Sequence, residues 1–312
     1  MDHITLGDVS ITRVWEYFGS VEMTPDTFFP ESPKEVWDDG ASWLAPHFLA
    51  PDTNVVNSAI QTWLLRSEGR TILVDTGVGN HKERPYAPVW SHLKTDFLAN
   101  LARAGAEPED VDIVINTHLH IDHVGWNTYL DGRQWVPTFP NATYLMPKDD
   151  FDFWNPENGH KPLLGRGNQN VFEDSVAPVH QAGLTRLWED GHRIDGNLRL
   201  EPAPGHTPGS SVLRLESGTD RAVFVGDMLH SPVQILEPDA NSCFCEDPAE
   251  ARATRRRLLG AAAEDNALVI PAHFGGHGAA EVVRDGGGFA IKGWAPFSPY
   301  AEENTERYIE QA

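Results

Sequence analysis

The segment THLHIDH, residues 117–123, places three histidines and one aspartate within six positions. In an extended turn the side chains at positions i and i+2 face the same way, so His118 and His120 can bind one ion. Asp122 and His123, just beyond them, can bind a second ion. Imidazole and carboxylate ligands without a thiolate suit zinc, manganese, iron or cobalt. The segment therefore predicts a site for two divalent metal ions, with zinc as the first choice.

Further candidate ligands follow short apolar segments that we expect to be β-strands. Four such segments each precede one candidate ligand: residues 111–115 precede His118, 198–201 precede His206, 222–225 precede Asp227 and 268–270 precede His273. Side chains at strand ends and in the following loops converge on one edge of a sheet. The four candidate ligands are therefore expected to lie together.

THLHIDH matches the H-x-H-x-D-H signature and resembles the metallo-β-lactamase fold superfamily. The rest of that pattern follows in order, with the Asp75-Thr76-Gly77 turn, His206, Gly226-Asp227 and His273, so that the resemblance covers residues 57–273. It implies an α/β (α+β) fold, an αββα four-layer sandwich with a two-metal site between the sheets. The implied ligands are His118, His120 and His206 for the first metal, Asp122, His123 and His273 for the second, and Asp227 as the bridge. It also implies that Asp75 orients a histidine ligand through its free ring N–H.

The resemblance implies hydrolysis by a hydroxide that bridges the two metals. Asp122 would take up a proton from the nucleophile, and Asp227 would hold both ions. The expected reaction is the opening of a lactone or the cleavage of a neutral carboxylic ester. The expected partner is therefore a small neutral ester or lactone.

Residues 226–234, GDMLHSPVQ, are similar to the branch that holds methyl parathion hydrolase and the quorum-quenching acyl-homoserine lactonases. The lactonases carry a tyrosine three residues after the bridging aspartate, where this chain has His230. His230 is either a catalytic hydrogen-bond donor or a structural histidine. A phosphotriesterase of the methyl parathion hydrolase type is the alternative function.

Four aromatic residues are candidates for the substrate pocket: Trp126, Phe28, Phe29 and Phe274. Trp126 lies in the loop after the metal motif, where an indole would narrow the cleft or form an apolar wall. Ordinary packing under that loop is the alternative for Trp126.

Charge and composition exclude several classes of partner. The 312 residues include 24 Lys and Arg against 46 Asp and Glu, a formal net charge of −22, which disfavours nucleic acid and anionic membranes. No apolar run of about 18 residues is present, and the N-terminus lacks a signal-peptide pattern, so we expect a cytoplasmic protein. Cys243 and Cys245 are expected to be reduced thiols in a loop, with a redox or metal role as the alternative.

The chain is expected to form one structural domain with two parts. Residues 1–56 would form a strand and then an irregular, aromatic-rich segment from 23 to 53, which we interpret as a lid or a dimer arm. Residues 57–312 would form the hydrolase domain. Exposed aromatics on the arm would favour a homodimer.

The predicted elements of the second part alternate between strands and helices. Strands are expected at 59–65, 71–74, 142–146 and 211–215, and helical patterns at 93–102, 148–154 and 248–263.

Other members of the superfamily fit less well. A glyoxalase-II-like thioesterase needs a basic cluster that the C-terminal third lacks, and a tRNA-processing nuclease needs a positive face. A persulfide dioxygenase uses a single iron, whereas every ligand of the second site is present here. Retention of all seven ligands also argues against a non-catalytic binding module.

Overall fold

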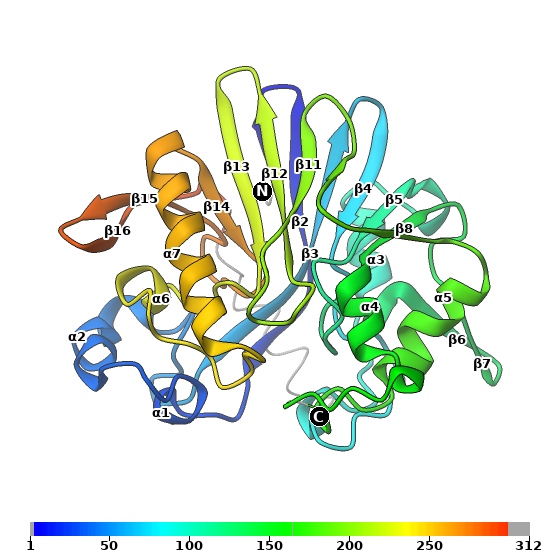
Figure 1. Cartoon of the computed structure of the whole chain (residues 1–312), viewed down its shortest axis with the longest axis horizontal. Coiled ribbons are helices and arrows are strands. Elements are labelled where there is room, and N and C mark those ends of the chain that lie inside the picture. Colours follow the sequence, from blue (N-terminus) through cyan, green and yellow to red (C-terminus); the bar gives the residue numbers. More distant parts are fainter. Residues whose placement is uncertain (1–2, 164, 299–312) are drawn as a thin grey trace.

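Two seven-stranded sheets form the centre of the protein, which is described here by a computed structural model for residues 3–163 and 165–298 (Figure 1). The first sheet has the order β1 (His3–Leu6), β2 (Val9–Ser20), β3 (Asn57–Ser67), β4 (Arg70–Val74), β5 (Ile113–Ile115), β8 (Thr143–Pro147) and β9 (Thr185–Trp188). The second has the order β10 (His192–Arg193), β11 (Leu198–Pro202), β12 (Ser211–Ser217), β13 (Asp220–Gly226), β14 (Leu268–Pro271), β15 (Ala280–Asp285) and β16 (Gly288–Trp294). A separate hairpin pairs β6 (Thr128–Asp131) with β7 (Gln134–Pro137).

Helices cover the outer faces of both sheets. They are α1 (Pro25–Phe28), α2 (Lys34–Leu44), α3 (Phe97–Arg103), α4 (Lys148–Trp154), α5 (Ala177–Gln181), α6 (Val233–Leu236) and α7 (Pro248–Asp265). Helix α7 packs on β13, β14 and β15, whereas α3 packs on β2 and α4 packs on β8 and β9. Figure 1 shows these two groups of helices on opposite sides of the paired sheets. The expected αββα four-layer sandwich is therefore confirmed.

Short helical turns complete the described chain. The 3-10 turns are Pro88–Trp90, Pro108–Asp110, Gly125–Asn127 and Pro156–Asn158, and a π-helical turn, Phe172–Val176, precedes α5. Among residues 3–163 and 165–298, no helix combines the length and the apolarity that a membrane span requires.

The interior consists of separate apolar clusters between the layers. One cluster joins the two sheets and includes Ile11 and Leu65 from the first sheet with Leu213 and Phe224 from the second. Because both faces of each sheet are covered, central strands such as β5 and β14 read as continuous apolar runs rather than alternating ones. This is why those strands could be predicted from the sequence.

Parallel pairing brings the loops after several strands to the same edge. Strand β5 runs parallel to β4 and β8, and β13 runs parallel to β14. The carboxyl ends of parallel neighbours lie at one edge of a sheet, so the loops after these strands meet there. The site is built from these loops.

The segment from 23 to 53 is not the irregular loop that we expected, because it contains α1 and α2. In α2, Trp37, Gly40 and Leu44 form a buried stripe at helical spacing, which the surrounding proline and acidic residues obscure in the sequence. Phe28 and Phe29 are also buried, inside the same apolar cluster as α7. These aromatics are therefore not an exposed patch, and the homodimer stays a prediction without their support.

Candidate metal centre

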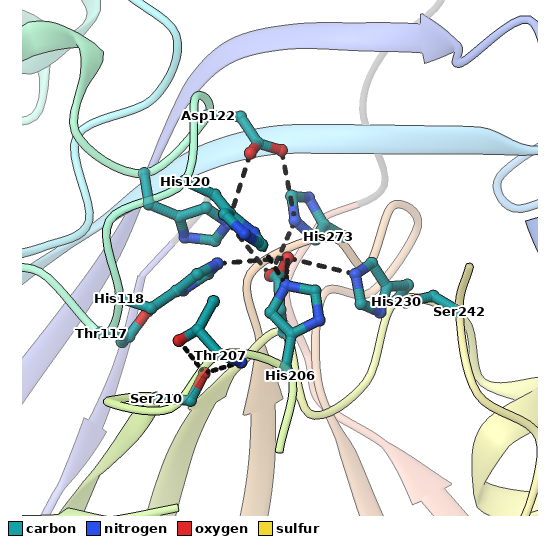
Figure 2. A network of polar contacts seen from close by, with 12 residues as sticks. Thr117, His118, His120, Asp122, His206, Thr207, Ser210, His230, Ser242 and His273 are labelled. Atoms are coloured by element: carbon teal, nitrogen blue, oxygen red, sulfur yellow. Dashed lines mark hydrogen bonds and ion pairs between the residues drawn. The ribbon is translucent and has the colours of Figure 1, made fainter. Parts of the chain in front are cut away.

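Three histidines from two loops form the first group of candidate ligands. His118 and His120 follow β5, and His206 follows β11, with His206 Nε2 2.9 Å from His120 Nδ1. Their ligand nitrogens and one carboxylate oxygen of Asp227 all lie within 4.8 Å of one another. Figure 2 shows the three rings pointing toward a common centre.

The second group contains Asp122, His123 and His273. Their ligand atoms also lie within 4.8 Å of one another. Asp122 Oδ1 is 3.7 Å from His123 Nε2, and Asp122 Oδ2 is 3.5 Å from His273 Nε2. The loop after β14 thus brings His273 to a pair of residues that lie more than a hundred positions earlier in the chain.

Asp227 lies between the two groups and gives one carboxylate oxygen to each. Its Oδ1 is 3.0 Å from His123 Nε2 and 2.9 Å from His273 Nε2. Its Oδ2 is 3.2 Å from His206 Nε2 and 3.6 Å from His118 Nε2. A carboxylate divided in this way has the arrangement of a ligand shared by two ions.

Gly226 allows this placement of Asp227. Its φ of +49° lies in the left-handed region, and a Cβ atom there would lie 2.7 Å from Thr117 Oγ1. A side chain at this position would push apart the two loops that carry His118 and Asp227.

The donor set fits divalent metal ions. His118 Nε2 and His120 Nε2 are buried and form no hydrogen bond, although buried polar atoms normally have a partner. Burial holds the pKa of His118 and that of His120 well below the ordinary value, which favours the neutral imidazole at these two positions. Nitrogen and carboxylate ligands without a thiolate in either group suit zinc, manganese, iron or cobalt.

Polar partners fix the rings from behind. Asp75 Oδ2 is 2.9 Å from His123 Nδ1, which is the contact predicted for Asp75, and its Oδ1 accepts a hydrogen bond from Thr117 N at 2.8 Å. His273 Nδ1 is 2.9 Å from the carbonyl oxygen of Ala59. The φ of Asp75 is +57°, a strained value that is held at a functional position. Such partners set ring orientation and basicity in metal sites.

His206 has a thiol as its outer partner. Cys245 Sγ lies 3.8 Å from His206 Nδ1. Burial disfavours a charged His206, but its contacts with Asp227 and Cys245 outweigh burial and raise its pKa to about 9. Both cysteines are free, and Cys243 is exposed whereas Cys245 is buried. The expectation of reduced thiols therefore agrees with the structure.

A cavity of about 320 Å³ opens onto this cluster. Asp122, Asp227, His230 and Phe28, all predicted site residues, line it. Among the described lining residues there is no lysine or arginine, and Glu22 is the charged residue outside the cluster. Its walls are formed by the N-terminal segment, by the residues around Trp90 and by Phe244.

His230 lies at the junction of the cavity and the cluster. Its Nε2 is 3.1 Å from Asp227 Oδ2, and its ring stacks on His273 with centroids 5.5 Å apart. The Phe28 ring forms a T-shaped contact with it, also with centroids 5.5 Å apart. The backbone N–H of His230 donates to Gln234 Oε1 at 2.7 Å. The imidazole is thus fixed beside the shared carboxylate.

Three predicted pocket residues do not line the cavity, which corrects the expectation. Trp126 stacks on Phe97 at 5.2 Å and donates its indole N–H to Glu16 Oε1 at 2.6 Å, so that the packing alternative holds. Phe29 is buried against Trp37. Phe274 is buried against Phe48. Each side chain fills an apolar cluster behind the site instead.

Several residues of the cavity wall were not expected from the sequence: Met23, Tyr86, Trp90 and Phe244. Tyr86 and Trp90 lie in a proline- and aromatic-rich loop that follows the Asp75-Thr76-Gly77 turn. A loop of that composition directly after a strand that ends at the metal site is a signal that could have identified them. Phe244 lies between Cys243 and Cys245, and no sequence feature indicates that it lines a cavity.

Comparison with known sequences places these residues in a described family. Residues 57–273 match the family model of the metallo-beta-lactamase superfamily. An N-acyl homoserine lactonase of Bacillus cereus is 23% identical over 175 residues, which are 53% of this chain and 61% of that protein. The N-acyl homoserine lactonase AttM of Azorhizobium caulinodans is 28% identical over 133 residues, 40% of this chain and 45% of that protein. The matches thus span about half the length of these relatives.

Solved structures resemble most of the chain. The hydrolase AbOPH of the beta-lactamase superfamily has a TM-score of 0.77 and 25% identity, and the match covers 96% of this chain and 97% of that one. AidC, described as a dizinc quorum-quenching lactonase, has a TM-score of 0.73 and 22% identity, with 93% and 95% covered. The likeness to AidC shows a common fold.

Proposed function

Because the chain belongs to the metallo-beta-lactamase superfamily, we propose that it is a metal-dependent hydrolase that opens lactones or cleaves neutral carboxylic esters. One observation carries the proposal. The two oxygens of Asp227 contact two separate groups of buried ligands beside a cavity, which is the arrangement required for two ions that share one carboxylate.

The proposed ligands of the first ion are His118, His120 and His206, and those of the second are Asp122, His123 and His273. Asp227, which contacts histidines of both groups, is proposed as a ligand of both ions. Divalent ions in these positions would supply Lewis acidity and a water molecule with a pKa near neutrality. We expect zinc, because the structural neighbour AidC is described as a dizinc enzyme.

Asp122 is the residue that we propose for moving the proton. It lines the cavity and lies beside His123 and His273. When water adds to the acyl carbon, its proton passes to the Asp122 carboxylate, the bond from that carbon to the leaving oxygen breaks, and the proton completes the leaving alcohol. Water and an ester thus give an acid and an alcohol, with no other reactant.

His230 is proposed to donate a hydrogen bond to a substrate oxygen. It lines the cavity, and stacking on His273 and packing by Phe28 fix its ring. A fixed donor needs little reorganisation as charge develops on an oxygen, which is how such groups lower a barrier.

The shape and charge of the cavity support a neutral, partly apolar substrate. Its volume of about 320 Å³ is at the lower end of the range for small-molecule sites. Phe28, Trp90 and Phe244 offer apolar surface, worth about 25 cal/mol per Å² of area buried. An anionic substrate would meet Glu22 and a chain of net charge −22. The names of the lactonase relatives agree with a small lactone.

A panel of substrates tests this proposal. Zinc-loaded protein is assayed with a neutral γ-lactone, a neutral aryl ester, a phosphotriester and a carboxylate-bearing analogue of the ester, at low and high salt. We expect the largest kcat/KM for the lactone or the neutral ester. A larger value for the phosphotriester would establish the alternative function. A preference for the anionic analogue that weakens with salt would contradict the proposed substrate class.

A further inference from the structure

Two buried carboxylates outside the ligand cluster join the loops that carry the ligands. Glu16 on β2 and Asp150 on α4 are fully buried. Both accept hydrogen bonds from backbone N–H groups of loops around the site. A buried carboxylate is costly unless it is well satisfied, so such a group strongly constrains the segments that donate to it.

Glu16 holds the segments next to Asp75 and His123. Its Oε2 accepts from Val78 N at 2.6 Å, and its Oε1 accepts from Gly79 N at 3.0 Å. The indole N–H of Trp126 also donates to Oε1, at 2.6 Å. Val78 and Gly79 follow the turn that contains Asp75, and Trp126 follows His123. Glu16 therefore connects the two chain segments whose side chains meet in the contact between Asp75 and His123.

Gly77 makes this approach possible. A Cβ atom at Gly77 would lie 1.8 Å from Glu16 Oε2, and the φ of Gly77 is +59°. The same two segments are also joined directly, since Thr76 N donates to the carbonyl oxygen of His123 at 2.8 Å and Gly125 N donates to that of Gly77 at 2.7 Å. Glu16 adds a further point of attachment from a different strand.

Asp150 holds the segments that carry the other three histidines. Its Oδ2 accepts from Leu119 N at 2.8 Å, and Leu119 lies between His118 and His120. Its Oδ1 accepts from Gly209 N at 2.7 Å, three residues after His206. One carboxylate on α4 thus fixes the distance between the loop after β5 and the loop after β11.

We propose that Glu16 and Asp150 are positioning residues that organise the two halves of the metal centre independently. Glu16 acts on the group of Asp122, His123 and His273, through His123. Asp150 acts on the group of His118, His120 and His206. The proposal rests on the two-metal site of the proposed function but not on the choice of substrate.

Zinc binding in two single-site backgrounds tests this division. His273→Ala leaves the first group complete, and His120→Ala leaves the second group complete. Asp150→Asn and Glu16→Gln are introduced into each background, because these changes keep the side-chain shape while placing an amide NH₂ against an N–H donor. The dissociation constant for Zn²⁺ alone is measured in the full-length protein by competition with a chromophoric chelator.

We expect each substitution to weaken zinc binding in only one of the two backgrounds. Asp150→Asn should weaken zinc binding at least about tenfold in the His273→Ala background and leave the His120→Ala background within about threefold. Glu16→Gln should do the reverse. Equal weakening in both backgrounds, or no weakening in either, would overturn the proposal.

Milder variants and a control keep the test decisive. Trp126→Phe removes one donor to Glu16, and Asp150→Glu keeps the charge but lengthens the side chain; each should show the same selectivity with a smaller change. Glu68→Gln is the matched control, because Glu68 is an exposed carboxylate that accepts from Gly196 N at 3.0 Å outside the cavity. Thermal unfolding of the metal-free variants shows whether they are folded.

The two proposals can fail separately. If the wild-type protein binds two zinc ions but each variant weakens both sites equally, only the separate positioning roles of Glu16 and Asp150 are refuted. If the wild-type protein binds no zinc, the proposed function fails as well. If the selectivity is found but no ester or lactone is hydrolysed, the positioning roles stand and the proposed activity does not.

Discussion

Asp227 is the residue at which the two ligand groups meet. Its oxygens lie 2.9 and 3.0 Å from His273 and His123 on one side and 3.2 Å from His206 on the other. Each histidine ligand is proposed for one ion, whereas the Asp227 carboxylate contacts histidines of both groups. The roles of these residues therefore differ in a way that substitution can measure.

Asp227→Ala should reduce bound zinc to well below one equivalent, because it removes a ligand from both groups. His273→Ala should retain about one equivalent. Elemental analysis after zinc-replete purification checks this, together with kcat/KM, which should fall further for Asp227→Ala than for any single histidine variant. Asp26→Ala, an exposed change, is the control. Two equivalents in the Asp227→Ala protein would contradict the shared role.

His230→Phe should lower kcat at least about tenfold while two zinc ions remain bound, because it removes a hydrogen-bond donor beside the substrate. His230→Gln, which keeps a donor, should recover part of the loss. The measurement is kcat with metal content on the same samples. An unchanged kcat would make His230 a packing residue, and loss of zinc would make it a support for Asp227.

The candidate ligands and their support Asp75 could be predicted from the sequence, whereas the supports Glu16 and Asp150 could not. The ligands in THLHIDH can be recognised because three histidines and an aspartate lie within six positions. The remaining ligands can be recognised because each follows a short apolar strand. Glu16 and Asp150 are isolated acidic residues whose partners are backbone N–H groups of distant segments, and a backbone donor leaves no mark in a sequence. Trp126 was misplaced for a related reason, since its partner Glu16 is 110 positions away.

At the scale of elements, the loop from residue 80 to 95 forms one wall of the cavity. Its ends are tied by hydrogen bonds between Asn80 and Thr95, and Arg84 pairs with Asp174 at 2.6 Å. The tip between these anchors carries Tyr86 and Trp90 into the cavity wall. Because the base is fixed, changes at the tip should affect substrate contact more than stability.

Trp90→Ala should raise KM for esters with long apolar chains at least about fivefold, since it removes apolar contact area. The kcat for a short ester should change by less than about twofold, because Trp90 is not one of the proposed ligands or proton-transfer residues. Comparison of kcat and KM across a chain-length series checks this, with Trp43→Ala, a partly exposed residue of α2, as the control. Equal effects on short and long esters would exclude Trp90 from chain-length selection.

The base of the same loop contains a buried lysine. Lys82 Nζ donates to Thr128 Oγ1 at 2.5 Å and lies 3.7 Å from the Trp135 ring centroid. Asp174 faces it at 3.6 Å, and Arg84 also contacts Asp174. Burial outweighs the attraction of Asp174 and lowers the pKa of Lys82 to about 7.

Between pH 7 and about 10, Lys82 is therefore protonated in the unfolded chain but deprotonated in the folded chain. Because the unfolded chain binds more protons, the free energy of unfolding rises with pH in this range. Lys82→Met should remove this contribution. The stability of the wild type relative to the variant should increase by at least about 1 kcal/mol from pH 7 to 9. Urea unfolding at both values checks this, with exposed Lys34→Met as the control. A difference independent of pH would refute the assignment.

Element prediction succeeded where hydrophobic periodicity is uninterrupted. The strands and helices around the motif were expected, and α4 begins and ends at the expected residues. Helix α2 was missed because its buried stripe rests on a few positions among acidic and small residues. Strands β15 and β16 form a hairpin at the edge of the second sheet, and the half-exposed pattern of β16 gives little contrast between its faces.

At the scale of the molecule, the sandwich brings together ligands from loops of both sheets. His118 to His123 follow β5 of the first sheet, whereas His206, Asp227 and His273 follow β11, β13 and β14 of the second. The four-layer arrangement could be predicted because the order of motifs resembles a known family. The N-terminal residues form two strands of the first sheet and then helices that share an apolar cluster with α7. This division depends on tertiary packing, which no local sequence pattern predicts.

We propose that this site needs two metal ions for hydrolysis. The most direct measurement is a titration of metal-free protein with Zn²⁺, with hydrolysis of a neutral γ-lactone or aryl ester followed at each step. We expect no turnover without metal and a plateau of activity at two equivalents of Zn²⁺ per chain. Full turnover by the metal-free protein, or a plateau at one equivalent with no second ion bound, would contradict it.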